Sequence, residues 1–171
     1  VAGDISRDRK QVVEALHHLT KNYQAVFYID GNDEHRWTLD ELQQSYADLY
    51  HSIKPIKNLV YLQDNVVVID GVAIISTNGW YPFDFDMSID PEQVMQWVMD
   101  EYHLSEVAIQ NIREMAKTDA AYIIKSIKRL QMHRDVEKIV VVTHTVPDSS
   151  LIEHDISLAG RLKFNVMGNN L

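Results

Sequence analysis

Four short polar segments each follow directly on an apolar stretch of the chain, and their side chains are of types that could bind a metal or move a proton. They are residues 3–4 (GD), residues 31–35 (GNDEH), residues 77–80 (TNGW) and residues 143–144 (TH). In open α/β sheets, ligands bind beyond the carboxyl ends of the strands. Residues far apart in the sequence can therefore converge at one edge of such a sheet.

Asp4, Asn32 and His144 offer two oxygens and one nitrogen as ligands. This mixed set suits Mn, Fe or Zn better than Ca. Divalent cations polarise phosphoryl oxygens and generate hydroxide at neutral pH, which is the chemistry that cleavage of a phosphate ester needs. Taken singly, each residue is more simply structural: Asp4 can cap the next helix, Asn32 suits a left-handed turn, and His144 can be a buried structural histidine.

The elements that must position these residues alternate along the chain, as in a layered α/β domain. Helical spacing of apolar residues predicts helices over about residues 8–22, 38–53, 90–102 and 105–132. Apolar runs predict strands over residues 25–29, 59–62, 66–69, 72–77 and 138–143. We expect the three middle strands to form an antiparallel meander and the last strand to be covered on both faces. A capping box at Thr38 is expected to begin the second helix.

The length of 171 residues predicts a single domain over residues 1–171, and the abrupt ends suggest that it is incomplete at both termini. The net charge of −9, with 25 acidic against 16 basic residues, argues against a broad nucleic-acid-binding surface. The lack of cysteine excludes disulfides and thiolate metal sites. Because neither a membrane span nor a signal peptide is visible, we expect a cytoplasmic protein; its oligomeric state is not predicted.

Three of the polar segments together resemble the calcineurin-like metallophosphoesterases. Residues 3–9 (GDISRDR) resemble that family's Gly-Asp-x-x-Asp-Arg block, with one extra residue before the second Asp. Residues 31–34 (GNDE) resemble its Gly-Asn-His-Asp/Glu block, and residues 140–147 (VVVTHTVP) resemble its strand that ends in a His. The order and the strand context agree over residues 3–147.

The resemblance implies a sandwich of mixed β-sheets flanked by helices, with a binuclear metal centre that hydrolyses phosphoric esters. It implies that Asp4 bridges two divalent ions (Mn, Fe or Zn) and that Asn32 and His144 bind the second one. The family's first block, Asp-x-His, and its closing block, Gly-His-x-His, are absent from this chain.

Asp33 stands where the family usually places a catalytic His. Asp33 could act as a general acid if its pKa were raised, and His35, two residues on, could take the role instead. Glu34 and Arg36 are expected to orient the Asn32 loop. Trp80 begins an aromatic loop that could bind the organic part of a substrate, although packing against the following helices is at least as well supported.

Two other interpretations stay open. The missing blocks and Asp33 are compatible with a catalytically silent protein of the same fold that serves as a protein-binding scaffold. A flavodoxin-like or nucleotide-binding sheet is less well supported, because the chain has neither a Gly-x-Gly-x-x-Gly motif nor a P-loop. The substrate of an enzyme with this sequence is not predicted.

Overall fold

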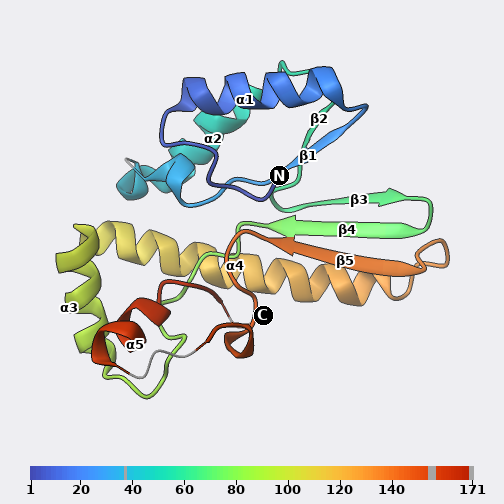
Figure 1. Ribbon diagram of the computed structural model, residues 1–171. Coiled ribbons are helices and arrows are strands. Elements are labelled where there is room, and N and C mark those ends of the chain that lie inside the picture. The colour runs from blue at the N-terminus through green and yellow to red at the C-terminus, as the bar shows by residue number, and fades with distance from the viewer. Residues whose placement is uncertain (37, 154–156, 170–171) are drawn as a thin grey trace.

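The computed structural model describes residues 1–36, 38–153 and 157–169. It has the mixed α/β organisation that the sequence predicts, built from helices and two small β-sheets (Figure 1). None of the helices in these ranges is long and apolar enough to cross a lipid bilayer.

The first sheet pairs strand β1 (Val26–Tyr28) in parallel with strand β2 (Leu59–Tyr61). Helix α2 (Leu42–Ile53) connects them, and helix α1 (Arg9–Asn22) packs beside α2 on the same sheet (Figure 1). The shared core contains Leu16 of α1, Tyr28 of β1 and Leu49 of α2. A parallel bridge between Ala2 and Ile29 sets the start of the chain next to the end of β1.

The second sheet has three strands in the order β3 (Asn65–Ile69), β4 (Val72–Thr77) and β5 (Lys138–Thr143). Strands β3 and β4 form a hairpin, whose turn places Asp70 and Gly71 at positive φ, as a tight two-residue turn requires. Strand β5 pairs in parallel with β4, so both strands end at the same edge of the sheet.

The predicted meander of three middle strands is wrong, because β2 belongs to the other sheet. A helix separates β1 from β2, and a strand–helix–strand unit pairs its strands in parallel. The predicted capping box is also wrong. A 3₁₀ turn (Leu39–Glu41) precedes α2, and the Thr38 hydroxyl bonds Ser45 rather than the helix backbone.

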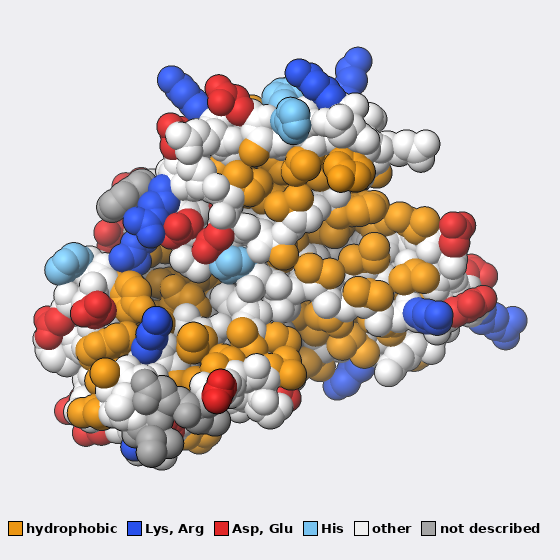
Figure 2. Space-filling view, in the orientation of Figure 1, with side chains coloured by type: hydrophobic (Ala, Val, Ile, Leu, Met, Phe, Trp, Pro, Cys, Tyr) orange, Lys and Arg blue, Asp and Glu red, His pale blue; other side chains and the backbone are white. Residues whose placement is uncertain are grey.

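Within the described residues a helix covers one face of the second sheet, whereas Ile69 and Val140 on the opposite face are exposed. Helix α4 (Glu106–Leu130) packs against Ala73 and Ile75 of β4. The pairing register places six aliphatic side chains on the opposite face: Val67, Ile69, Val72, Ile74, Val140 and Val142. Figure 2 shows apolar side chains spread across this region. The prediction that the last strand is covered on both faces is therefore wrong, since Val140 is 45% exposed.

The largest core cluster lies between α4, helix α3 (Pro91–Tyr102) and helix α5 (Leu158–Phe164). The predicted helices over residues 90–102 and 105–132 are confirmed, with Asp90 and Ser105 as N-caps. Most of the aromatic loop after β4 is buried in this cluster, including Trp80 and Phe83. The structure thus supports packing of this loop against the following helices.

Asp119 joins α4 to the end of β4. Its carboxylate is completely buried and accepts hydrogen bonds from the backbone N–H groups of Gly79 (2.7 Å) and Trp80 (3.1 Å). Burial raises the pKa of Asp119 to about 7, against the opposing effect of the Thr77 hydroxyl and these two N–H groups. The position that the chain takes on leaving β4 therefore depends on one buried carboxyl group.

The raised pKa of Asp119 predicts a pH-dependent stability. Between pH 4 and 7 the folded chain holds this proton more tightly than the unfolded chain. The protonated carboxyl group therefore adds to the free energy of unfolding below about pH 4, and this stabilisation is lost as the pH rises to about 7. Asp119→Asn keeps an acceptor oxygen without a titrating proton. We expect the wild-type free energy of unfolding, relative to that of the variant, to fall by about 2–4 kcal/mol over this range in urea titrations. An identical dependence of the free energy of unfolding on pH in the two proteins would contradict this.

Candidate functional site

Three loops meet between the two sheets, beyond the ends of β1 and β5: residues 2–5, residues 31–35 and residues 143–146 (Figure 1). The two glycines at their crossing have no room for a side chain. A Cβ on Gly3, which has φ +73°, would lie 2.5 Å from the backbone nitrogen of Gly31 and 2.7 Å from Nδ1 of His144. A Cβ on Gly31 would collide with the Asp4 carboxylate. The glycines of both sequence motifs therefore allow the loops to approach each other closely.

This crossing brings together Asp4, Asn32 and His144, the three residues that the sequence predicts as metal ligands. Nε2 of His144 lies 3.2 Å from Oδ1 of Asn32 and 3.4 Å from Oδ1 of Asp4. The Asp4 side chain is 38% exposed and that of His144 is 16% exposed. The cluster therefore lies at the surface, where a small ligand can reach it.

A hydrogen bond behind His144 determines which of its nitrogens faces the cluster with a lone pair. Nδ1 of His144 lies 2.9 Å from the carbonyl oxygen of Ala2, which can only accept, so Nδ1 carries a hydrogen. In the neutral ring, Nε2 is then an acceptor pointing at two oxygens. A proton on Nε2 or a bound cation is needed to relieve that repulsion.

The pKa values follow the same electrostatics. Burial opposes the charged form of His144, but the bonds to Asp4 and to the Ala2 carbonyl outweigh it and raise the pKa of His144. Burial likewise opposes the charged form of Asp4. The interaction with His144 and the backbone N–H of Asp33, 2.9 Å from Oδ1, outweigh it and lower the pKa of Asp4. The site thus favours a positive charge between these groups.

The three donor atoms could hold one divalent ion. The two distances from Nε2 of His144 are those of neighbouring ligands around a metal, and the backbone bond to Nδ1 is the usual way in which proteins orient a metal-binding histidine. Across the described ranges no group of three or more His, Asp or Glu side chains is placed to hold a metal ion, and the cluster here has only two such side chains together with the Asn32 amide. The nearby carboxylates of Asp33 and Glu34 have other partners.

Glu34 holds the two glycine loops together. Its buried carboxylate accepts three backbone N–H groups, from Asp4 (3.0 Å), Ile5 (2.7 Å) and Gly31 (2.7 Å). The sequence suggests that Glu34 orients the Asn32 loop, and these bonds agree. They also extend its role to the Asp4 loop, which lies thirty residues earlier in the chain.

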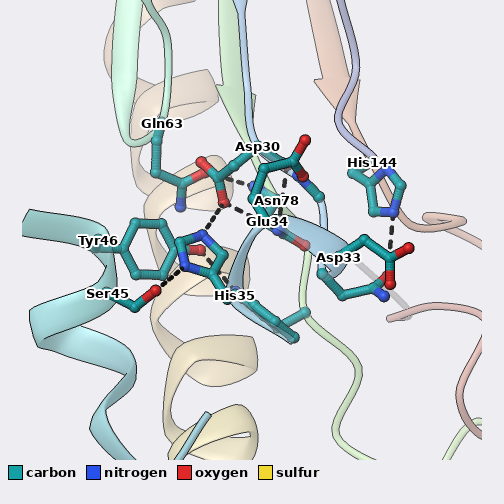
Figure 3. Close-up of polar contacts among 12 residues, drawn as sticks. Asp30, Asp33, Glu34, His35, Ser45, Tyr46, Gln63, Asn78 and His144 are labelled. Carbon is teal, nitrogen blue, oxygen red and sulfur yellow. Dashed lines mark hydrogen bonds and ion pairs between the residues drawn. The ribbon is translucent and has the colours of Figure 1, made fainter. Parts of the chain in front are cut away.

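His35 lies in the interior and shows no exposed surface. Its Nε2 lies 3.0 Å from Oδ2 of Asp30, its Nδ1 lies 2.7 Å from the Ser45 hydroxyl, and its ring stacks on Tyr46. Figure 3 shows this group on one side of Glu34 and Asn78, with His144 on the other side. Both ring nitrogens are engaged in bonds that fix the start of the Gly31 loop. Proton transfer by His35 stays a prediction.

Asp33 and Trp80 lie in different surroundings. Oδ2 of Asp33 forms an ion pair with Nε of Arg7 at 3.0 Å, at the rim of the cluster. Trp80 is completely buried, and its indole N–H donates to the Tyr46 hydroxyl at 2.7 Å. The structure therefore places Trp80 in the core and not on the surface of a groove, and its role in substrate binding stays a prediction.

A buried polar layer under the cluster is absent from the sequence-based prediction. Asp30, at the end of the first sheet, accepts from the amide of Asn78, and Gln63 donates to Asp119 at 3.4 Å. Burial opposes ionisation of Asp30, but bonds from His35, Tyr61 and Asn78 lower its pKa. One signal was available: Asp119 follows Ile112 and Ala116 at helical spacing, which places an acidic residue on the apolar face of α4.

The three N–H bonds of Glu34 generate a testable prediction. In Glu34→Gln, an amide NH₂ replaces one acceptor oxygen and faces a backbone N–H donor. We expect a loss of about 1–3 kcal/mol in the free energy of unfolding, measured by urea titration. Glu14→Gln, on the exposed face of α1, is the matched control and should change stability little. Equal stability of the Glu34 variant and this control would show that the bonds do not hold the loops.

Comparisons with known proteins give the chain no relative. No protein-family model matches it, and neither a curated protein nor a solved structure does. What can be said of its function is therefore based on the geometry of the three crossing loops and on the order of the three sequence blocks.

Proposed function

We propose that the chain is a metal-dependent hydrolase of phosphoric esters, with Asp4, Asn32 and His144 as metal ligands. One observation supports this most directly. Two oxygens that can bind a cation, Oδ1 of Asn32 and Oδ1 of Asp4, lie within 3.4 Å of Nε2 of His144, and the Ala2 carbonyl holds the ring with this nitrogen toward them. The order of the three sequence blocks supports the same assignment.

A divalent ion held by these residues would supply Lewis-acid activation of a phosphoryl group and of a water molecule. The chain's own residues have separate tasks. Glu34 keeps Asp4 and Gly31 at their spacing, and the Asp33 backbone N–H holds Oδ1 of Asp4. The Arg7 guanidinium, paired with Asp33, supplies positive charge at the rim where an anionic substrate would arrive.

The binuclear centre and the sheet sandwich that the resemblance implies are also part of the proposal. The clustered ligands described above suffice for one ion (Mn, Fe or Zn), and a second ion would need ligands beyond them. The aliphatic face of the second sheet, opposite α4, offers the kind of surface on which another sheet packs in a sandwich.

The alternative is a protein-binding scaffold without catalytic activity. The pairing of Asp33 with Arg7 favours it, because the family's catalytic His is replaced by a carboxylate that is already neutralised. The two functions differ in whether the cluster binds a metal and whether the protein turns over a phosphate ester.

Calorimetric titration with Mn²⁺ tests the metal site. We expect saturable binding by the wild-type chain, and affinity weakened at least about tenfold in Asp4→Asn and in His144→Gln, because the first variant loses the anionic charge of its ligand and the second loses the imidazole nitrogen. His17→Gln, on the exposed face of α1, is the matched control and should bind like the wild type. Equal affinities for all four proteins would place any bound metal elsewhere.

Hydrolysis of an aryl phosphate monoester and of an aryl phosphate diester, with and without Mn²⁺, tests the activity. We expect metal-dependent turnover of at least one of them, and its loss in His144→Gln. Tight metal binding at the cluster without turnover of either ester would favour the scaffold.

A further inference from the structure

A pocket of about 330 Å³ lies beside the Asn32 loop, at the junction of α3 and α4. It is lined by two arginines, Arg7 and Arg36, together with Asp40, Tyr102 and the first residues of α4. Its size is at the lower end of the range for pockets that bind small molecules. The chain as a whole is acidic, with a net charge of −9, so two guanidinium groups at one pocket form a local basic site on it.

Arg7 connects this pocket to the proposed metal site. Its Nε lies 3.0 Å from Oδ2 of Asp33, and the backbone N–H of Asp33 bonds Oδ1 of Asp4 at 2.9 Å. A molecule that reaches Asp4, Asn32 and His144 with one end can therefore meet Arg7 on the way to the pocket. The pocket and the cluster then form two parts of one binding surface.

Arg36 is held in a fixed orientation at the pocket wall. One of its terminal N–H groups donates to the carbonyl oxygen of Tyr102 at 3.2 Å, and its guanidinium carbon lies 5.5 Å from the centre of the Tyr102 ring. A guanidinium has five N–H donors in a rigid plane, so this bond leaves donors that can engage a planar anion.

The beginning of α4 adds to the positive potential. Ser105 and Ala108 line the pocket, and Ser105 caps the helix by accepting the Ala108 N–H at 3.0 Å. The N-terminus of a 25-residue helix carries a partial positive charge. Asp40 opposes it, and its carboxylate accepts a bond from the Ser105 hydroxyl. Asp33 pairs with Arg7, so the two carboxylates offset the formal charge of the two guanidinium groups, and the local positive potential comes from the fixed Arg36 guanidinium and the start of α4.

We propose that this pocket binds a carboxylate carried by the organic part of the phosphate ester. The inference rests on the proposed function for the position of the phosphoryl group, and adds a substrate class: phosphate esters whose leaving group bears a carboxylate. The carboxylate is recognised by Arg36 and Arg7, with the first turn of α4 behind them.

Non-hydrolysable phosphonates test this by calorimetry in the presence and absence of Mn²⁺. Two matched pairs differ only in the carboxylate: 3-phosphonopropionate against propylphosphonate, and 4-carboxyphenylphosphonate against phenylphosphonate. We expect the carboxylate to improve affinity about tenfold in at least one pair, as a charge-assisted bond to arginine does. Arg36→Gln and Arg7→Gln should each lower the ratio of the two affinities in that pair toward one. Arg129→Gln, exposed at the far end of α4, should retain it.

The outcomes separate the two proposals. A missing preference in both pairs, or a preference that neither Arg7→Gln nor Arg36→Gln reduces, would overturn the carboxylate pocket. Arg7 is half exposed, so its variant tests the pocket even if Arg36→Gln does not fold. If Mn²⁺ improves the binding of no phosphonate while the arginine-dependent preference persists, the metal function is wrong and the anion pocket is supported.

Discussion

The geometry of the site depends on the close approach of two backbone segments that are far apart in the sequence. Backbone N–H groups at such a crossing must be bonded, because a buried unpaired donor costs about 1–3 kcal/mol. Glu34 provides three of these bonds from one carboxylate, and glycine at positions 3 and 31 leaves room for the two backbone segments to approach each other. The positions of the Asp4 and Asn32 side chains both follow from that crossing.

At the crossing, hydrogen-bond acceptors of three different side chains face one another. His144 is fixed from behind by the Ala2 carbonyl, so its Nε2 meets two oxygens in front, and the arrangement needs a proton or a cation to be stable. Beneath this cluster, His35, Asp30 and Asn78 form a buried layer linked by hydrogen bonds through the Asp30 carboxylate, while Oδ1 of Asn78 has no partner among the described residues. The chain thus separates a buried inner layer, which fixes the loops, from an outer layer that can bind a ligand.

The residues of the outer layer can be predicted from the sequence because they follow strands and glycines, and these are local signals. The helices over residues 90–102 and 105–132 are predictable for the same reason, from helical spacing and N-caps. The pairing of β2 with β1 is not predictable in this way, because a short apolar run does not reveal its partner strand. The apolar run of β5 likewise does not indicate which face of the strand is covered. The buried layer was missed because Asp30 and Asp119 have partners 48 and 40 residues away.

Nitrogen-15 NMR of the histidine rings during titration with Zn²⁺ can decide whether His144 binds the ion, because it reports on each ring nitrogen separately. We expect Nδ1 of His144 to stay protonated throughout, while the Nε2 resonance of the same ring shifts as the ion binds. The signals of His35, which is enclosed by Asp30 and Ser45, should not move. Saturable Zn²⁺ binding that leaves the His144 resonances unchanged would contradict the metal site formed by Asp4, Asn32 and His144.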